Sequence, residues 1–146
     1  MQDYHKLKVW EKSHVLAMDV HRIAGGFPRV DGVALTGQLR RAVLSIPANI
    51  AEGAAKPGNA EFRRFLHIAL ASAAETDYHL LAARDLGLLE LATYEDLSAR
   101  TIEVRRMLGG LIKKVSGTPD AGTKPEGTKP EGTKPESGTQ RPITQH

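Results

Sequence analysis

The sequence predicts an all-α protein, an antiparallel up-and-down four-helix bundle. Residues 9–114 contain four amphipathic segments whose apolar residues recur every three or four positions, and none with the alternating pattern of a strand. Short connections that contain glycine or proline separate these segments. Such connections are typical of helices that pack antiparallel to their neighbours in sequence, so the segments are expected to share one core.

Glycine and proline residues set the expected ends of the first two helices. The first helix is expected over residues 9–24, because Gly25, Gly26 and Pro28 interrupt the pattern directly after it. The second is expected over residues 35–53, LTGQLRRAVLSIPANIAEG, which carries one continuous apolar stripe.

The second expected helix contains an internal proline, Pro47, followed by polar residues. Proline has no N–H for the carbonyl of Val43 and its ring crowds that turn, so we expect a kink just before it. Asn49 and Glu52 follow near the edge of the apolar stripe, where their side chains are expected to fill the hydrogen-bonding gap. Gly53 is expected to end or loosen the helix.

Two longer helices follow. The third is expected to begin near Asn59, interpreted as its N-cap, and to run to about Leu86, with Gly87 as the stop signal. The fourth is expected to open after Thr93, whose hydroxyl caps the first turn, and to continue in heptad steps to about Lys114.

The composition fits a single soluble domain. The chain has 146 residues, of which 40% are hydrophobic, enough for one modest core. It contains no cysteine, which excludes a disulfide framework, a thiolate metal site and a cysteine nucleophile and agrees with a cytoplasmic location. The first residues are too polar for a signal peptide, and no apolar run reaches the length of a membrane span.

The net positive charge belongs to the expected bundle, because the charges of the tail cancel. The formal net charge is +3, whereas residues 117–146 carry equal numbers of basic and acidic side chains. That tail repeats GTKPE three times and has almost no apolar side chain, so we expect it to be disordered. The predicted organisation is therefore a basic four-helix bundle over residues 1–116 and a disordered tail over residues 117–146.

One block of the second expected helix is specific for a known family. QLRRA followed by SIPANIAEG places proline, asparagine, glutamate and glycine in order on an amphipathic helix. Further matching segments are LKVWEKSHVLAMDVHRI (7–23), FP (27–28), EFRRFLHIALASAAE (61–75) and RRMLGGLIKK (105–114). On these residues the chain resembles the four-helix bundle proteins encoded by intervening sequences of bacterial 23S ribosomal RNA genes. The resemblance covers nearly all of the chain before residue 117.

The resemblance implies a bundle that assembles into a homopentameric ring and has no established catalysis. Relatives include the accessory variability determinant of diversity-generating retroelements, a basic ring that associates with a reverse transcriptase and with nucleic acid. The implied partners are therefore further copies of the chain, RNA or DNA backbone and a reverse transcriptase, with no membrane. The alternative is a protein-interaction scaffold with no nucleic-acid role, because both branches share the bundle.

Paired basic residues on the expected helices form the candidate nucleic-acid-binding surface. Adjacent residues on a helix point about 100° apart, so at most one of each pair lies near a seam of the bundle. The alternative for each residue is a solvated face or a salt bridge. In a ring, each exposed cation is repeated, which favours salt-sensitive binding to phosphates. The candidate residues are Arg40, Arg41, Arg63, Arg64, Arg105, Arg106, Lys113 and Lys114.

Asn49, Glu52 and Glu75 are interpreted as a structural polar network rather than a catalytic group. No nucleophile with a neighbouring base and no glycine-rich phosphate loop accompanies them, so we expect no enzyme activity. We expect Arg40 or Arg41 to form a bridge with Glu52 or Glu75.

Metal and cofactor sites are not expected. A ferritin-type site uses two ExxH motifs and two further glutamates. Only Glu11 and His14 form an ExxH pair in this sequence, and His67 and His79 have no such partner motif. We therefore expect no metal and no cofactor.

Overall fold

The computed structural model describes residues 2–117, apart from the side chains of residues 30–33. A short 3-10 helix, η1 (Tyr4–Lys6), precedes four α-helices: α1 (Lys8–Ala24), α2 (Arg29–Ala55), α3 (Asn59–Asp85) and α4 (Leu91–Ser116). No strand occurs between residues 2 and 117, so the all-α prediction is confirmed. The repeat tail predicted to be disordered lies outside the described residues, except for Gly117.

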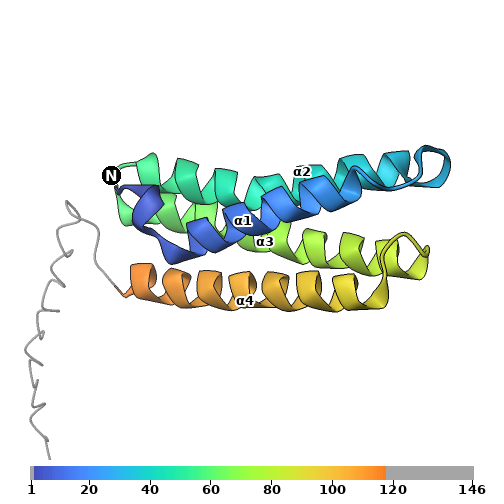
Figure 1. The fold of residues 1–146 in the computed structure, drawn as a ribbon. Helices are drawn as coiled ribbons and strands as arrows, with labels where there is room; N and C mark the ends of the chain where they lie inside the picture. Colours follow the sequence, from blue (N-terminus) through green and yellow to red (C-terminus); the bar gives the residue numbers. More distant parts are fainter. Residues whose placement is uncertain (1, 118–146) are drawn as a thin grey trace, which may run out of the picture.

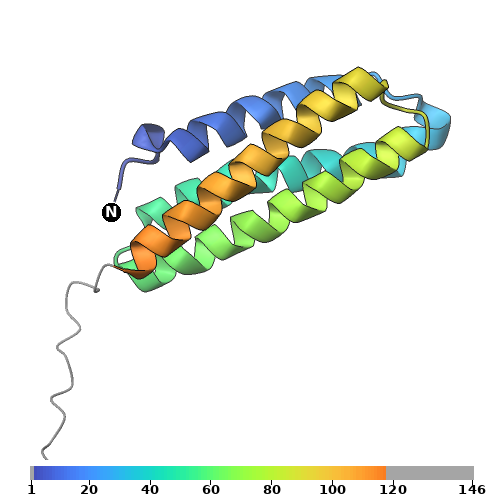
Figure 2. The ribbon, with the colours of Figure 1, turned by 90° about the horizontal axis from the view of Figure 1, so that it is seen from below.

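The four helices form an up-and-down bundle (Figures 1 and 2). Each helix packs against the helices before and after it in sequence, and α4 closes the bundle against α1. The contact between α1 and α4 is the least extensive of the four, and that between α2 and α3 is the most extensive. The beginning of α1 and the end of α4 lie at the same end of the bundle (Figure 1).

The core follows the apolar stripes that the sequence predicts. Its largest fully buried side chains come from every α-helix, and alanines fill the space between them. Within the described residues, no helix is both long enough and apolar enough to cross a bilayer. The largest of these core residues are Leu16, Leu39, Ile46, Ile50, Leu66, Leu80, Leu97 and Leu108.

The starts of α2 and α4 differ from the predictions, whereas α3 begins at Asn59 as expected and differs only in its N-cap. Helix α2 begins at Arg29, six residues before the expected Leu35, because the extended backbone of Pro28 ends the preceding turn. Helix α3 has Gly58 as its N-cap instead of Asn59, since Gly58 adopts a φ of 85°, which favours glycine. Helix α4 starts at Leu91, and no side chain caps its N-terminus, so the expected Thr93 cap is wrong.

Helix α2 continues without interruption past both Pro47 and Gly53 and ends only at Ala55. The expected end at Gly53 is therefore wrong. A Cβ at residue 53 would lie 2.6 Å from the Cβ of Phe65 and 3.2 Å from Cδ2 of Phe62. Glycine here permits α2 and α3 to approach closely, rather than terminating α2.

Candidate nucleic-acid interface

Arg40 forms hydrogen bonds with the last turn of α1. The carbonyl of His21, in the last turn of α1, accepts from the N–H of Gly25 at 3.2 Å and has a second lone pair for a further donor. Arg40 on α2 reaches across, and its Nε and Nη2 donate to the carbonyl of His21 at 3.1 and 2.8 Å. The guanidinium therefore caps α1 and places a positive charge at its negative end.

Arg41 points from α2 toward α3. Its Nη2 donates to Oε1 of Gln38 at 3.0 Å and to Oε1 of Glu75. Glu75 also lies 3.2 Å from Nε2 of His79. The hydrogen bond with His79, followed by the hydrogen bond and charge of Arg41, lowers the pKa of Glu75 against the opposing effect of burial. The bridge expected from the sequence is thus present between Arg41 and Glu75.

The arginine pair at the start of α3 differs from Arg40 and Arg41, because only one of its members contacts a neighbouring helix. Arg63 turns toward α4, where its Nη1 donates to the carbonyl of Val115 at 3.3 Å. Arg64 turns outward, pairs with Glu61 at 3.2 Å and lies 4.6 Å above the ring of Phe65. Its side chain remains 58% exposed, so Arg64 is accessible to an external anion.

The basic residues of α4 include two without an internal partner. Arg105 lies 3.6 Å from Oδ2 of Asp77 on α3. Arg106 and Lys113 are exposed, and neither forms an ion pair with any residue from 2 to 117. Lys114 is also exposed. Among the eight predicted residues, Arg106 and Lys113 are thus exposed and carry a charge that no described carboxylate balances, whereas the exposed Arg64 shares its charge with Glu61.

The polar network differs from the prediction at Glu52. Asn49 donates to the carbonyl and hydroxyl oxygens of Ser45 at 2.7 and 2.9 Å, and Ser45 lies 2.8 Å from the hydroxyl of Ser72 on α3. The amide thus binds Ser45 rather than the carbonyl of Val43, which faces Pro47 and its missing N–H. Glu52 is exposed and takes no part among the described side chains. It cannot reach Arg41, since both lie on α2, about 16 Å apart along the axis.

Comparison with known proteins identifies the family. The model of the 23S rRNA-intervening sequence protein family matches residues 5–110. The chain belongs to this family. Among solved structures, it is similar to a protein of unknown function from the S23 ribosomal protein family of Bacteroides thetaiotaomicron VPI-5482. The two share 27% identity with a TM-score of 0.66, over 72% of this chain and 98% of the other. A comparison of the present chain with curated proteins found no match.

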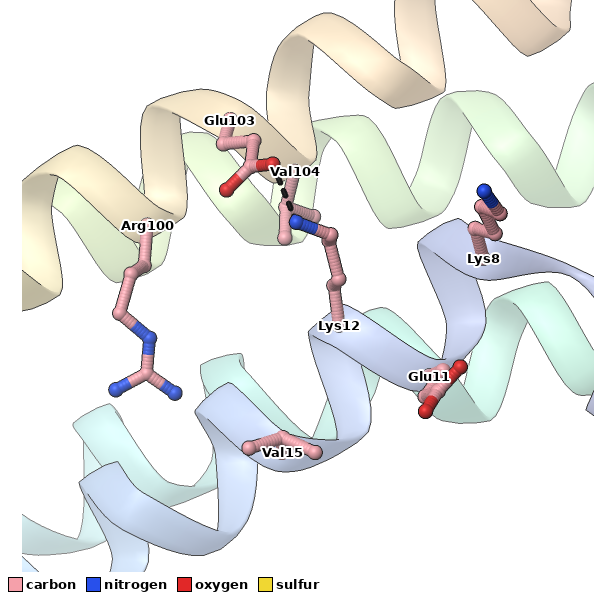
Figure 3. Close-up of a pocket in the computed structure, with 7 residues that line it drawn as sticks. All are labelled: Lys8, Glu11, Lys12, Val15, Arg100, Glu103 and Val104. Atoms are coloured by element: carbon pink, nitrogen blue, oxygen red, sulfur yellow. Dashed lines mark hydrogen bonds and ion pairs between the residues drawn. The ribbon is translucent and has the colours of Figure 1, made fainter.

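A groove lies between α1 and α4 (Figure 3). Its volume is about 420 Å³. Lys12 and Glu103 span it, with 2.5 Å between Nζ and Oε1, and Glu11 adds a second carboxylate. Acidic side chains lie among the basic ones, so this groove is a poor phosphate site. Its lining residues are Lys8, Glu11, Lys12, Val15, Arg100, Glu103 and Val104.

The described residues do not assemble a metal-binding cluster. No group of three or more histidine or acidic side chains between residues 2 and 117 is placed to hold a metal ion. His14 of the lone ExxH pair stacks on Trp10, with ring centroids 5.1 Å apart. The family is described by its gene location and not by a catalytic activity, and the function of the similar Bacteroides protein is unknown.

Sequence reasoning missed three members of the α2–α3 seam. Ser45, Ser72 and His79 join the contacts of Asn49 and Glu75. The available signal was a serine at a core-facing position of each helix, because a buried hydroxyl requires a partner. That signal identifies Ser45 and Ser72, but neither His79 nor the pairing of the two serines across the helices.

Proposed function

We propose that this member of the intervening-sequence family is a non-catalytic nucleic-acid-binding accessory protein that acts as a homo-oligomer. The observation that carries the proposal is the pair Arg106 and Lys113, which are exposed on α4 and unpaired within the described residues. The charge excess of the chain belongs to the part before residue 117, which adds support. Repetition of these cations in a ring, with a pentamer preferred, multiplies weak phosphate contacts into strong binding.

Binding to a labelled RNA and to DNA of the same sequence tests this function. We expect affinity to fall steeply between about 50 and 200 mM salt, because binding to phosphates releases condensed counterions. Size-exclusion chromatography with light scattering determines the oligomeric state in the same buffers. A purified oligomer that shifts neither nucleic acid at low salt contradicts the proposal.

The protein partner follows from the branch of the family. In a diversity-generating retroelement the partner is the reverse transcriptase, and the ring presents RNA to it. Co-purification of the two proteins, with and without ribonuclease, separates a direct contact from one mediated by RNA. A reverse-transcriptase gene and a template repeat beside this gene favour this branch, whereas a location inside a 23S ribosomal RNA gene favours the other.

A protein-interaction scaffold with no nucleic-acid role is the second candidate. The observation that favours it is the exposure of large apolar side chains. Tyr78, Leu86 and Leu91 are each more than 60% exposed. Exposed apolar surface is typical of protein contact sites when it forms a continuous patch. A protein complex that survives ribonuclease and high salt, with no affinity for RNA or DNA, supports this candidate.

A further inference from the structure

Two glycines of α4 have no explanation within the bundle. Gly109 and Gly110 lie in the interior of the helix, and neither has a positive φ. A Cβ built on either residue meets no described atom within 4 Å. Glycine lowers the stability of a helix interior relative to alanine, and here no packing constraint requires it. The missing side chains leave the backbone of α4 open to close approach from outside the bundle.

Gly109 belongs to a straight line of outward positions on α4. Ile102, Arg106, Gly109 and Lys113 follow one another at steps of four, three and four residues, which places them on one face of a helix. Arg106 and Lys113 lie two turns apart, about 10.5 Å along the axis, with the glycine between them. A bare stretch of backbone is thus flanked by two available cations.

A groove between α3 and α4 borders the same line. It has a volume of about 280 Å³ and is lined by Leu70, Ile102, Arg105 and Arg106. No carboxylate lines it, in contrast to the groove between α1 and α4. The charge of Arg105 is partly balanced by Asp77, whereas that of Arg106 is not. The groove therefore suits an anion with an apolar portion.

We propose that one strand of a nucleic acid runs along α4 over Gly109 and Gly110, with its phosphates held by Arg106 and Lys113. This inference rests on the proposed function and specifies its contact surface. Arg106 and Lys113 stand about 10.5 Å apart along the α4 axis, so each faces a different phosphate of a strand that lies along the helix. Arg106 and Lys113 bind these two phosphates, while the glycines let the intervening sugar–phosphate chain lie close to the helix backbone.

The double variant Gly109→Ala/Gly110→Ala tests the contact. Its methyl groups enter open space, so the bundle folds and melts at least about 4 °C higher. We expect its Kd for single-stranded RNA, measured by fluorescence anisotropy, to rise about tenfold, a loss of one decade in affinity. In the same assay, Arg106→Gln/Lys113→Gln reduces the slope of log Kd against log salt by about two per bound copy.

Matched controls separate this contact from general effects. Gly37→Ala adds a methyl group to an exposed glycine of α2, which also meets no described atom within 4 Å, and is expected to raise stability without changing Kd. Arg22→Gln removes a cation from α1 whose side chain is 75% exposed, and is expected to leave the slope unchanged. The inference is wrong if Gly37→Ala raises Kd as much as the double glycine variant of α4 does. It is also wrong if Arg22→Gln reduces the salt slope as much as a substitution of Arg106 or Lys113 does.

The remaining outcomes are distinguishable. If the wild-type protein binds RNA but the glycine variant binds it equally well, the inference fails while the proposed function stands. If the wild-type protein binds no nucleic acid, the proposed function fails. A change of oligomeric state in the glycine variant assigns the glycines to contacts between copies and overturns the inference. Equally tight binding of polyglutamate at the same residues indicates an acidic protein partner and also overturns it.

Discussion

Gly53 of α2 lies directly against Phe65 of α3, so closely that a Cβ on residue 53 would come within 2.6 Å of the Cβ of Phe65. Phe62 borders the same position, at 3.2 Å. Both phenylalanines are buried. The end of α2 is thus positioned by two aromatic residues that require a glycine opposite them, and the last turns of the SIPANIAEG block depend on this contact.

Gly53→Ala is expected to destabilise the bundle. The added methyl group meets backbone-proximal atoms that cannot rotate away, which costs about 1–3 kcal/mol and outweighs the gain in helix propensity of about 1 kcal/mol. Urea unfolding followed by circular dichroism measures the change. Gly37→Ala is the control, because its methyl group meets no described atom and only the propensity gain remains. Equal stability gains in both variants would show that the α2–α3 contact relaxes freely.

The bridge between Arg41 and Glu75 is expected to contribute modestly to stability. Both side chains are more than a third exposed, at 58% and 38%, so solvent screens the pair. Glu75→Ala should lower the free energy of unfolding by up to about 1 kcal/mol, as for other exposed pairs. A double-mutant cycle with Arg41→Gln isolates the coupling between them. An unchanged melting temperature in Glu75→Ala would refute a structural role for this carboxylate.

Stability is expected to fall in acid through two carboxylates. A hydrogen bond from Arg100 chiefly lowers the pKa of Asp19, and one with His79 chiefly lowers that of Glu75. Folded carboxylates with lowered pKa values bind fewer protons than unfolded ones, so their contribution is present above the ordinary values of 3.8 and 4.5. It is lost as the pH falls through the lowered values.

Melting temperatures measured from neutral pH into acid check this sign. The double variant Asp19→Asn/Glu75→Gln should melt below the wild-type protein at neutral pH and converge with it in acid. A difference that stays constant across the whole range would exclude titration of these two groups as its origin.

Asn49→Ala is expected to cost about 1 kcal/mol, because it removes two hydrogen bonds to Ser45 from the seam between α2 and α3. Glu52→Gln is the matched control on the same helix, since Glu52 is exposed and has no described partner. Chemical denaturation of both variants gives the comparison. Equal losses of unfolding free energy in the two variants would show that Glu52 contributes to the network.

Arg40→Gln separates structural from binding arginines. The variant loses the cap on the His21 carbonyl and should be destabilised by about 1 kcal/mol. Its affinity for RNA, measured on the folded protein, should equal that of the wild type. A loss of affinity as large as that of Arg106→Gln would place Arg40 on the binding surface.

The helix ends show where local signals were sufficient. Gly25 and Gly26 follow α1 as predicted, because two consecutive glycines lower helix propensity and Pro28 follows them in the chain. Gly53 was assigned the same role incorrectly. Gly53 contacts Phe65, which lies on another helix, and the sequence around residue 53 does not indicate which residue will pack against it.

The sequence by itself determined the fold class, the number of helices, their inward faces and the family. These properties depend on hydrophobic periodicity along one chain, which can be counted residue by residue. Only the tertiary structure decided that Arg40 caps α1, that Arg41 meets Glu75 rather than Glu52, and that Arg106 remains available. An arginine side chain reaches several positions, so its partner depends on the rotation and register of two packed helices. Those quantities are set by the packing of the whole core.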